Sequence, residues 1–240
     1  QQKIMTPDKS KVYIVIPAFN EGKVIAKVIR NIQKEGFNNI IVIDDGSFDD
    51  TYKIAKSNQV TVLKHLINRG KGSATQTGLE VAKRLDAQIV VTMDADGQHS
   101  EKDIIKLVKP IADGEVDVVL GSRFLLQNKV PILKIIANKI GNIVTWLFYG
   151  IYVTDSQSGF RAYSNKANKL IETTMDRYEF ESEILYLIKK NNLKYQEVPI
   201  EVFYTHHSKT KYDEIPNFTK QKITNGFIMI YRMTVRSILS

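Results

Sequence analysis

The sequence of 240 residues predicts an α/β protein whose central sheet is mostly parallel. Two observations carry this prediction. Short β-branched apolar runs alternate along the chain with longer stretches that have apolar residues at helical spacing, which is typical of parallel strands joined by crossover helices. Hydrophobic residues make up 43% of the chain, enough for one domain with a sizeable core.

The expected strands share apolar runs that are bounded by polar or glycine-containing turns. They are Val12–Ile16, Ile40–Ile43, Val60–Leu63, Ile89–Met93, Val116–Leu120, Phe160–Tyr163 and Val198–Val202. The first should stop at Pro17, because proline cannot donate to a ladder. The last is expected at an edge of the sheet.

The expected helices share apolar residues at intervals of three and four. They run from Val24 to about Lys34, from Asp49 or Asp50 to about Ser57, from the segment 70–74 to about Leu85, and from Glu101 to about Ala112, and a further one contains Phe180–Glu183. Val130–Tyr152 is expected to form one long helix or two short ones, packed on the sheet or lying on a membrane interface. Phe218–Leu239 reads as a basic amphipathic helix.

Composition excludes several classes of protein. There is no cysteine, so disulfide scaffolds, thiolate metal sites and cysteine nucleophiles are ruled out. The net charge of +8 suggests an anionic partner, such as nucleic acid, a nucleotide or an acidic membrane surface. No stretch reaches the roughly 18 apolar residues of a membrane span.

The chemistry is expected to centre on Ile89–His99, where an apolar strand runs into two carboxylates. Asp94 and Asp96 are two positions apart, so in an extended chain they point to the same side. Two carboxylates at such a short distance repel each other and need a positive counter-charge. Mg²⁺ or Mn²⁺ supplies one and keeps positions open for substrate phosphates.

Four polar clusters directly follow expected strands, and in a parallel sheet they meet at one edge. They are Pro17–Glu21, Asp44–Ser47, Asp94–His99 and Gly121–Arg123. Their convergence predicts a nucleotide-type pocket, in which acidic turns hold base and ribose and the metal holds the diphosphate.

Other nucleotide-binding and hydrolytic classes lack their motifs here. No G-x-G-x-x-G follows the first strand, and Gly70-Lys71-Gly72 lacks the Walker spacing. No serine lies in a G-x-S-x-G turn, and the four histidines show no zinc spacing.

Five motifs, in this order, resemble the signature set of family 2 glycosyltransferases. They are Val15–Glu21, Ile43–Ser47, Asp94–His99, Gly121–Arg123 and Ser158–Arg161. The branch they most resemble is that of the dolichyl- and polyprenyl-phosphate hexosyltransferases, typified by dolichol-phosphate mannose synthase. The resemblance implies a GT-A fold, a GDP- or UDP-hexose donor, Mg²⁺ or Mn²⁺, and inversion at the anomeric carbon.

The resemblance also implies roles for single residues. Base and ribose would be held by Pro17, Phe19, Glu21 and Asp45, and further donor contacts would come from Ile43 and Ala95. The metal and the diphosphate would be surrounded by Asp94, Asp96 and Gln98, and Arg123 would contact phosphate.

The acceptor decides whether the reaction needs a base. A lipid phosphate has a second pKa near about 6 and needs only cations to position it; the candidates are Arg123, Lys134, Arg161 and Lys209. A sugar hydroxyl would need a general base, for which Asp155, Glu181 and Glu183 are the candidates. Where the branch carries arginine and serine this chain has Lys134 and Asn138, and Phe203–Thr205 replaces a further arginine.

Three functions therefore stay open: transfer to a polyprenyl (dolichyl) phosphate, transfer to a sugar hydroxyl in cell-surface polysaccharide or glycan synthesis, and a non-catalytic nucleotide-sugar-binding subunit. The expected organisation is a catalytic domain over residues 1–209 and a basic amphipathic segment over 210–240. We expect peripheral attachment to an anionic membrane surface on its cytoplasmic face, or otherwise a cytoplasmic protein. We expect no nucleic-acid partner, and a partner membrane protein or a homo-oligomer both stay open.

Overall fold

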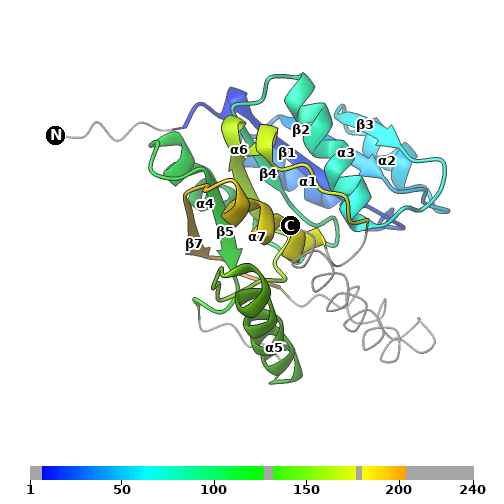
Figure 1. The fold of residues 1–240 in the computed structure, drawn as a ribbon. Coiled ribbons are helices and arrows are strands. Elements are labelled where there is room, and N and C mark those ends of the chain that lie inside the picture. Colours follow the sequence, from blue (N-terminus) through cyan, green and yellow to red (C-terminus); the bar gives the residue numbers. More distant parts are fainter. Residues whose placement is uncertain (1–6, 127–131, 177–179, 204–240) are drawn as a thin grey trace.

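A single seven-stranded sheet organises the computed structural model, which describes residues 7–126, 132–176 and 180–203 (Figure 1). The strand order is β3-β2-β1-β4-β6-β5-β7. All neighbouring strands run parallel except β6, which is antiparallel to both β4 and β5. The predicted α/β class with a mostly parallel sheet is confirmed.

The strands and helices have the following bounds. The strands are β1 Val12–Ala18, β2 Asn39–Asp44, β3 Thr61–Lys64, β4 Ile89–Thr92, β5 Val118–Ser122, β6 Arg161–Ser164 and β7 Tyr195–Pro199. The α-helices are α1 Ile25–Lys34, α2 Thr51–Ser57, α3 Lys71–Arg84, α4 Ile104–Ala112, α5 Ile132–Tyr149, α6 Asn165–Leu170 and α7 Phe180–Lys190, with short 3-10 turns at Lys9–Lys11 and Glu101–Asp103.

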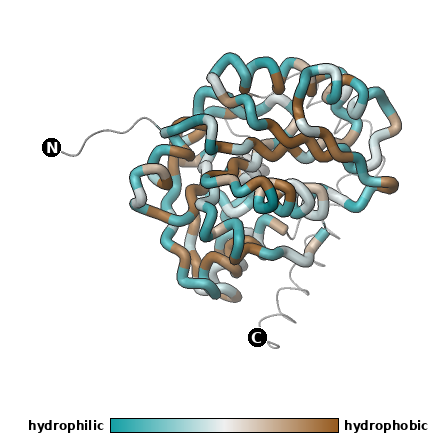
Figure 2. The backbone as a smooth tube through the Cα atoms, turned by 90° about the horizontal axis from the view of Figure 1, so that it is seen from above, coloured by the Kyte–Doolittle hydropathy of each residue, from teal (hydrophilic) through white to brown (hydrophobic). Residues whose placement is uncertain are grey.

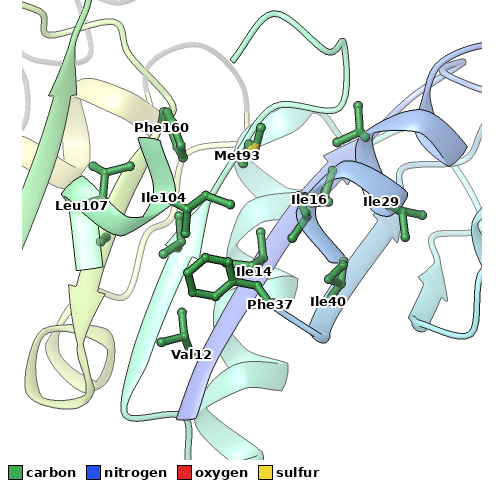
Figure 3. Packing of buried hydrophobic residues seen from close by; sticks show 14 of the residues in the cluster. Val12, Ile14, Ile16, Ile29, Phe37, Ile40, Met93, Ile104, Leu107 and Phe160 are labelled. Atoms are coloured by element: carbon green, nitrogen blue, oxygen red, sulfur yellow. The ribbon is translucent and has the colours of Figure 1, made fainter. Parts of the chain in front are cut away.

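Two hydrophobic clusters fill the two faces of the sheet. On one face, β1 side chains such as Ile14 and Ile16 pack with α1 and α4 (Figure 3). Val15 points to the other face, where it packs with α3, α6 and α7. Figure 2 shows the hydrophobic positions running through the middle of the molecule, with hydrophilic positions on the outer turns of the helices. The doubly covered sheet explains why its strands read as continuous apolar runs.

Three strands differ from the prediction by two or more residues at an end. Strand β1 continues through Pro17 to Ala18, because β4 ends at Thr92, opposite Val15, so the proline lies where β1 keeps only β2 as a partner. Strand β5 begins two residues later than predicted. Strand β7 lies at the sheet edge as predicted but covers Tyr195–Pro199, since an edge strand leaves polar residues half-buried and lacks a clear apolar run.

Helix α5 is one continuous helix, and its polar side faces the protein. Among its described residues, those buried along its length are small or polar, namely Asn138, Gly141, Asn142 and Thr145, and Tyr149 is buried at its last position. Its outer side carries large apolar residues that are 50–66% exposed: Ile136, Ile140, Ile143, Trp146 and Leu147. This is the reverse of an ordinary surface helix. In Figure 1, α5 projects from the body of the molecule.

Two predicted features lie outside the described residues: the candidate acceptor cation Lys209 and the helix Phe218–Leu239. The boundary at residue 209 stays a prediction for the same reason. Within the described ranges, no helix is both long enough and apolar enough to cross a membrane.

Candidate active site

The four polar clusters meet at one edge of the sheet, as the sequence predicts. Strands β1, β2, β4 and β5 all end at this edge, because each is parallel to the others. The antiparallel β6 begins there, so it brings the preceding loop Asp155–Phe160 to the same place. The site is therefore built from strand ends and from one strand start.

Asp94 lies at the centre of the site and is paired with a lysine. The Lys71 Nζ atom lies 2.8 Å from Asp94 Oδ1 and 3.0 Å from Glu181 Oε1. Burial alone would lower the pKa of Lys71, but the two carboxylates outweigh burial and raise it above its ordinary value. Burial alone would raise the pKa of Asp94, and the charges and hydrogen bonds of Lys71 and His99 overcome this and lower it. Lys71 and Asp94 therefore both carry charge at neutral pH.

Gly159 leaves room for this ion pair. A Cβ atom at position 159 would lie 2.5 Å from Lys71 Nζ and 2.9 Å from Asp94 Oδ1, so any side chain there would push the pair apart. The Gly159 carbonyl accepts a hydrogen bond from Thr92 Oγ1 at 2.8 Å, which ties this loop to the end of β4. A small pocket opens beside the pair, lined among others by Pro17, Thr92 and Glu181.

Asp96 and Gln98 form the turn that follows Asp94. Asp96 accepts a hydrogen bond from the backbone amide of Gln98 at 3.0 Å and another from its side-chain amide. The turn is held from outside by Phe203, whose amide donates to the Gln98 carbonyl at 2.7 Å, and by a bridge between His99 and Val202.

The carboxylates of Asp94 and Asp96 fit a hard divalent cation. Both residues are partly exposed, and Mg²⁺ or Mn²⁺ is commonly held by one or two carboxylates together with substrate phosphates. A closed cage of three or more acidic or histidine ligands is not found among the described residues.

On the side of the site predicted to hold the nucleotide, Asp45 organises the loop before α3. Its Oδ1 atom accepts from His65 Nδ1 at 2.7 Å and from the Arg69 amide at 3.0 Å, and its Oδ2 atom accepts from the Gly70 amide at 2.7 Å. Both oxygens of Asp45 are thus bound by the protein. Donor contacts by this side chain would have to share these oxygens.

The other residues proposed for the donor lie around the same strand ends. Phe19 packs edge to face on Phe48, with ring centroids 6.0 Å apart, and Pro17 lines the small pocket. Glu21 is buried, and its backbone amide donates to Thr51 Oγ1 at 2.8 Å. The side chains of Ile43 and Ala95 are packed in the two hydrophobic clusters.

At the other end of the site, Arg123 and Asp155 form a bidentate pair. Arg123 Nε and Nη2 each lie 2.7 Å from an oxygen of Asp155, and the Arg123 amide also donates to Asp155 Oδ2 at 3.1 Å. The Asp155 side chain is completely buried, whereas 23% of the Arg123 side chain is exposed. This geometry fixes the guanidinium group firmly, while part of the Arg123 side chain stays exposed.

The segment that carries Asp155 is held in place by hydrogen bonds from β7 and from α5. Glu197 on β7 accepts from the amide and hydroxyl of Thr154 at 2.9 and 2.8 Å. Asn138 and Asn142 on α5 both donate to the Thr154 carbonyl, at 2.7 and 2.9 Å. The buried polar face of α5 therefore positions the loop that positions Arg123.

Arg161 proves to be a buried brace. It is 1% exposed, and it donates to the backbone carbonyls of Ser158, Ser156 and Glu181 at 2.8, 3.0 and 3.0 Å. These bonds join the Asp155–Phe160 loop to the first turn of α7. This placement differs from the expected acceptor-binding cation, because its donors are directed at the protein's own backbone. We propose that it positions the loop.

Each of the three carboxylates considered as a general base is already bound. Glu181 is paired with Lys71, and Asp155 with Arg123. Glu183 is fully buried and accepts from the amides of Thr174 and Met175 at 3.0 and 2.9 Å. In this state their charges are neutralised or hydrogen-bonded by the protein.

Lys71 and Gly159 are the main site residues that sequence reasoning missed. A signal is present in the sequence, because Lys71 stands between two glycines where a helix begins, but Gly70-Lys71-Gly72 lacks the Walker spacing and so does not by itself indicate a site. Lys209 lies outside the described residues. Lys134 lies in α5, in a part whose side chains are not described.

The fold and the site together define a glycosyltransferase of the GT-A fold. Glucosyl-3-phosphoglycerate synthase of Mycobacterium tuberculosis superposes with a TM-score of 0.66 at 22% identity, over 92% of this chain and 83% of that chain. A structure of the same enzyme with Mn²⁺, uridine diphosphate and phosphoglyceric acid gives a TM-score of 0.65 at 20% identity, over 91% and 78%. Residues 13–171 match glycosyl transferase family 2, and the chain belongs to this family. The predicted family and fold are confirmed.

Relatives extend over nearly the whole chain. An uncharacterised protein of Methanocaldococcus jannaschii is 41% identical over 236 residues, covering 96% of this chain and 94% of its own. The UDP-N-acetylglucosamine–dolichyl-phosphate N-acetylglucosaminyltransferase of Methanococcus voltae is 40% identical over 244 residues, covering 92% and 94%. Polyprenol monophosphomannose synthase of Mycolicibacterium smegmatis is 26% identical over 200 residues, covering 78% and 75%.

Proposed function

We propose that this glycosyltransferase moves a sugar from a UDP-sugar to a polyprenyl (dolichyl) phosphate, with inversion at the anomeric carbon. The Methanococcus voltae relative, 40% identical along almost its full length, is named for such a transfer. Uridine diphosphate is also the nucleotide in the solved structural neighbour. UDP-N-acetylglucosamine is therefore the first donor to test, ahead of UDP-glucose and GDP-mannose.

The proposal of a phosphate acceptor rests on one observation: every candidate general base is already bound by the protein. A hydroxyl acceptor needs a carboxylate that can take its proton, and Asp155, Glu181 and Glu183 are all bound by cations or backbone amides. A phosphate monoester arrives largely as a dianion at neutral pH, since its second pKa is near about 6. It can attack without giving up a proton, so this site suits a phosphate.

In the proposed reaction, a phosphate oxygen of the acceptor forms a bond to the anomeric carbon while the bond to the β-phosphate oxygen of the donor breaks. Asp94 and Asp96 would hold Mg²⁺ or Mn²⁺, which supplies neutralisation of the charge that builds on the leaving diphosphate. Arg123, locked by Asp155, would orient the anionic phosphate. Lys134 and Lys209 are proposed as further cations for the acceptor.

Product analysis tests the acceptor. The purified protein is incubated with the labelled UDP-sugar, a divalent cation and one of three acceptors: a polyprenyl phosphate, the matching polyprenol, or an oligosaccharide. We expect transfer to the phosphate alone. Transfer only to the oligosaccharide would establish the hydroxyl-acceptor function, and donor binding without transfer to any of them would establish a non-catalytic subunit.

We also propose that α5 brings the enzyme to the bilayer that holds its acceptor. Ile136, Ile140, Ile143 and Leu147 follow the spacing of one helix face, and each is at least half exposed. Trp146 and Tyr152, which are 52% and 64% exposed, are the aromatic types enriched at membrane interfaces.

The charges of α5 favour the same partner. The helix contains two lysines and no acidic residue, and Lys139 is exposed beside the apolar stripe. Lysines near an anionic leaflet contribute about 1 kcal/mol each, and apolar insertion adds to this. Attachment of this kind is peripheral; the cytoplasmic face and the contribution of residues 210–240 stay predictions.

A further inference from the structure

Lys71 competes for the carboxylate that the metal needs. Its ammonium group lies 2.8 Å from Asp94 Oδ1, within direct ion-pair contact. A divalent cation that binds the same carboxylate is repelled by an ammonium group at this distance, because two like charges cannot share one small anion without cost. The ion pair must therefore loosen when a metal approaches Asp94.

Glu181 gives the Lys71 ammonium group a second carboxylate with which to pair. Its Oε1 atom lies 3.0 Å from Lys71 Nζ, so the lysine touches both carboxylates at once. The Oε2 atom of Glu181 is buried and makes no hydrogen bond among the described residues. A buried oxygen without a hydrogen bond is costly, and in a native structure it calls for an explanation.

The surroundings confine the lysine to these two positions. Gly159 stands directly against Nζ, and Glu181 is held in place because Arg161 donates to its backbone carbonyl at 3.0 Å. A small movement of Nζ from Asp94 toward Glu181 Oε2 keeps the ammonium group paired throughout. It also satisfies the oxygen that has no hydrogen bond.

We propose that Lys71 is an internal counter-cation that neutralises Asp94 in the empty site and passes to Glu181 when metal and nucleotide bind. Glu181 is then a positioning residue that sets how readily Asp94 becomes available. The exchange rests on the proposed donor and metal, and it is independent of which acceptor is used.

A purely structural ion pair predicts a different pattern from the exchange. If the pair only supports the fold, removing either partner disturbs Asp94 and weakens metal binding in the same direction. In the exchange, the two removals act oppositely. Glu181→Gln leaves Lys71 with Asp94 as its only carboxylate and so weakens metal binding, whereas Lys71→Met removes the competitor.

The test measures binding of Mn²⁺ with UDP by calorimetry and by the electron paramagnetic resonance signal of free Mn²⁺. The variants are Glu181→Gln, Lys71→Met and the double variant, which leaves neither an unpaired lysine nor an unpaired buried carboxylate. Lys166→Met and Glu80→Gln are matched controls, since both change the same charges on exposed or half-exposed side chains away from Asp94. Circular dichroism and thermal unfolding establish that each variant is folded.

We expect Glu181→Gln to weaken Mn²⁺–UDP binding at least fivefold. Lys71→Met should bind as tightly as the wild type or more tightly, and the double variant should return to within about threefold of wild type or tighter. If Lys71→Met does not fold, the double variant decides in its place.

Weakening in both single variants, or no change beyond the controls in either, overturns the exchange while the donor assignment stands. Weaker binding of UDP alone in Lys71→Met, measured with EDTA, also overturns it, because Lys71 would then contact the nucleotide directly. A wild-type protein that binds no Mn²⁺–UDP overturns the proposed donor and metal together with the exchange.

Discussion

Replacing two apolar residues on the outer face of α5 with serine should release the enzyme from membranes without unfolding it. The variant is Ile140→Ser with Leu147→Ser, at positions that are 57% and 66% exposed. Because neither side chain is buried in the protein, each change should alter the free energy of unfolding by only about 0.5 kcal/mol.

The loss of membrane affinity follows from the exposed area. Full burial of a leucine or isoleucine side chain is favourable by about 1.5–3 kcal/mol, and somewhat more than half of each residue is available to the bilayer. We take about 1 kcal/mol for each site, or about 2 kcal/mol together. At about 1.4 kcal/mol per factor of ten, the partition coefficient should fall roughly 30-fold.

Vesicle co-sedimentation measures this change, with vesicles of phosphatidylcholine and phosphatidylglycerol at low salt. The matched control is Leu85→Ser with Ile105→Ser, which removes the same two residue types from positions that are 47% and 36% exposed, at the C-cap of α3 and on α4. The control variant should bind vesicles like the wild type, and added salt should weaken both equally through screening.

Equal sedimentation of the α5 variant and the wild type would refute membrane contact through this face. The same two proteins are also compared without vesicles, to test whether the exposed apolar face of α5 binds another protein chain instead. If the wild type forms a dimer without vesicles and the α5 variant does not, the apolar stripe is covered by a second copy of the chain.

Three further predictions concern the site. Asp96→Asn should reduce transfer by orders of magnitude while thermal unfolding stays unchanged, because its carboxylate lies at a partly exposed turn and is proposed to hold the metal; wild-type turnover in the presence of a chelator would contradict this role. Asp155→Asn should lower kcat through misorientation of Arg123 and leave UDP affinity within about threefold, as calorimetry would show; lost UDP binding would move the pair to the donor side. The rate with a lipid phosphate should rise through about pH 6 and then stay level to about pH 9, because the acceptor becomes a dianion, while the lowered pKa of Asp94 and the raised pKa of Lys71 keep both groups charged over this range. If this rise occurs at the same pH when the acceptor is a phosphonate of different pKa, the ionising group belongs to the protein and not to the acceptor.

The folded-state pKa values also give the sign of the contribution to stability. The lowered pKa of Asp94 stabilises the fold above the ordinary range of a carboxyl and is lost as the pH falls through the folded-state pKa. The raised pKa of Lys71 stabilises the fold below the ordinary range of a lysine and is lost only as the pH rises through its folded-state pKa. Between these limits the contribution of the pair is constant, so it adds no pH dependence near neutrality.

The set of polar clusters that meet at one edge of the sheet could be predicted, because it depends on local sequence patterns. Each strand is a contiguous apolar run, and each polar cluster follows its strand directly, so a parallel sheet alone brings Asp45, Asp94 and Arg123 to one edge. The partners of these side chains were not predictable in the same way. Lys71 reaches Asp94 from α3, and Glu181 reaches Lys71 from α7, through contacts that no spacing in the sequence encodes.

Arg161 shows that the burial of a single residue cannot be predicted from its place in the sequence. A lone arginine in a polar loop has the same sequence pattern whether it binds a ligand or braces a backbone. The positioning role proposed for it rests on three carbonyls, of Ser156, Ser158 and Glu181, which converge only after β6 pairs with β4 and α7 packs beside it. These bonds engage all three nitrogens of the guanidinium group and offset part of the cost of burying its charge.

The orientation of α5 was unpredictable for a different reason. Periodicity shows that a helix has one polar and one apolar face, but not which of them meets the protein. The answer depends on the Thr154 carbonyl, which needs donors in a buried place and receives them from Asn138 and Asn142. Once these polar residues face inward, the isoleucines of the same helix must face outward.

This reversal connects the proposed membrane contact to the proposed chemistry. The inward amides of α5 hold Thr154, and the next residue, Asp155, holds Arg123 in a bidentate grip. The same helix therefore presents its apolar side to the surroundings and its polar side to the loop that orients the cation proposed for the acceptor phosphate. A lipid phosphate needs both at once, since its chain lies in the bilayer and its head group must reach the sugar donor. A soluble sugar acceptor would need neither the exposed isoleucines nor their placement on the helix that fixes Arg123.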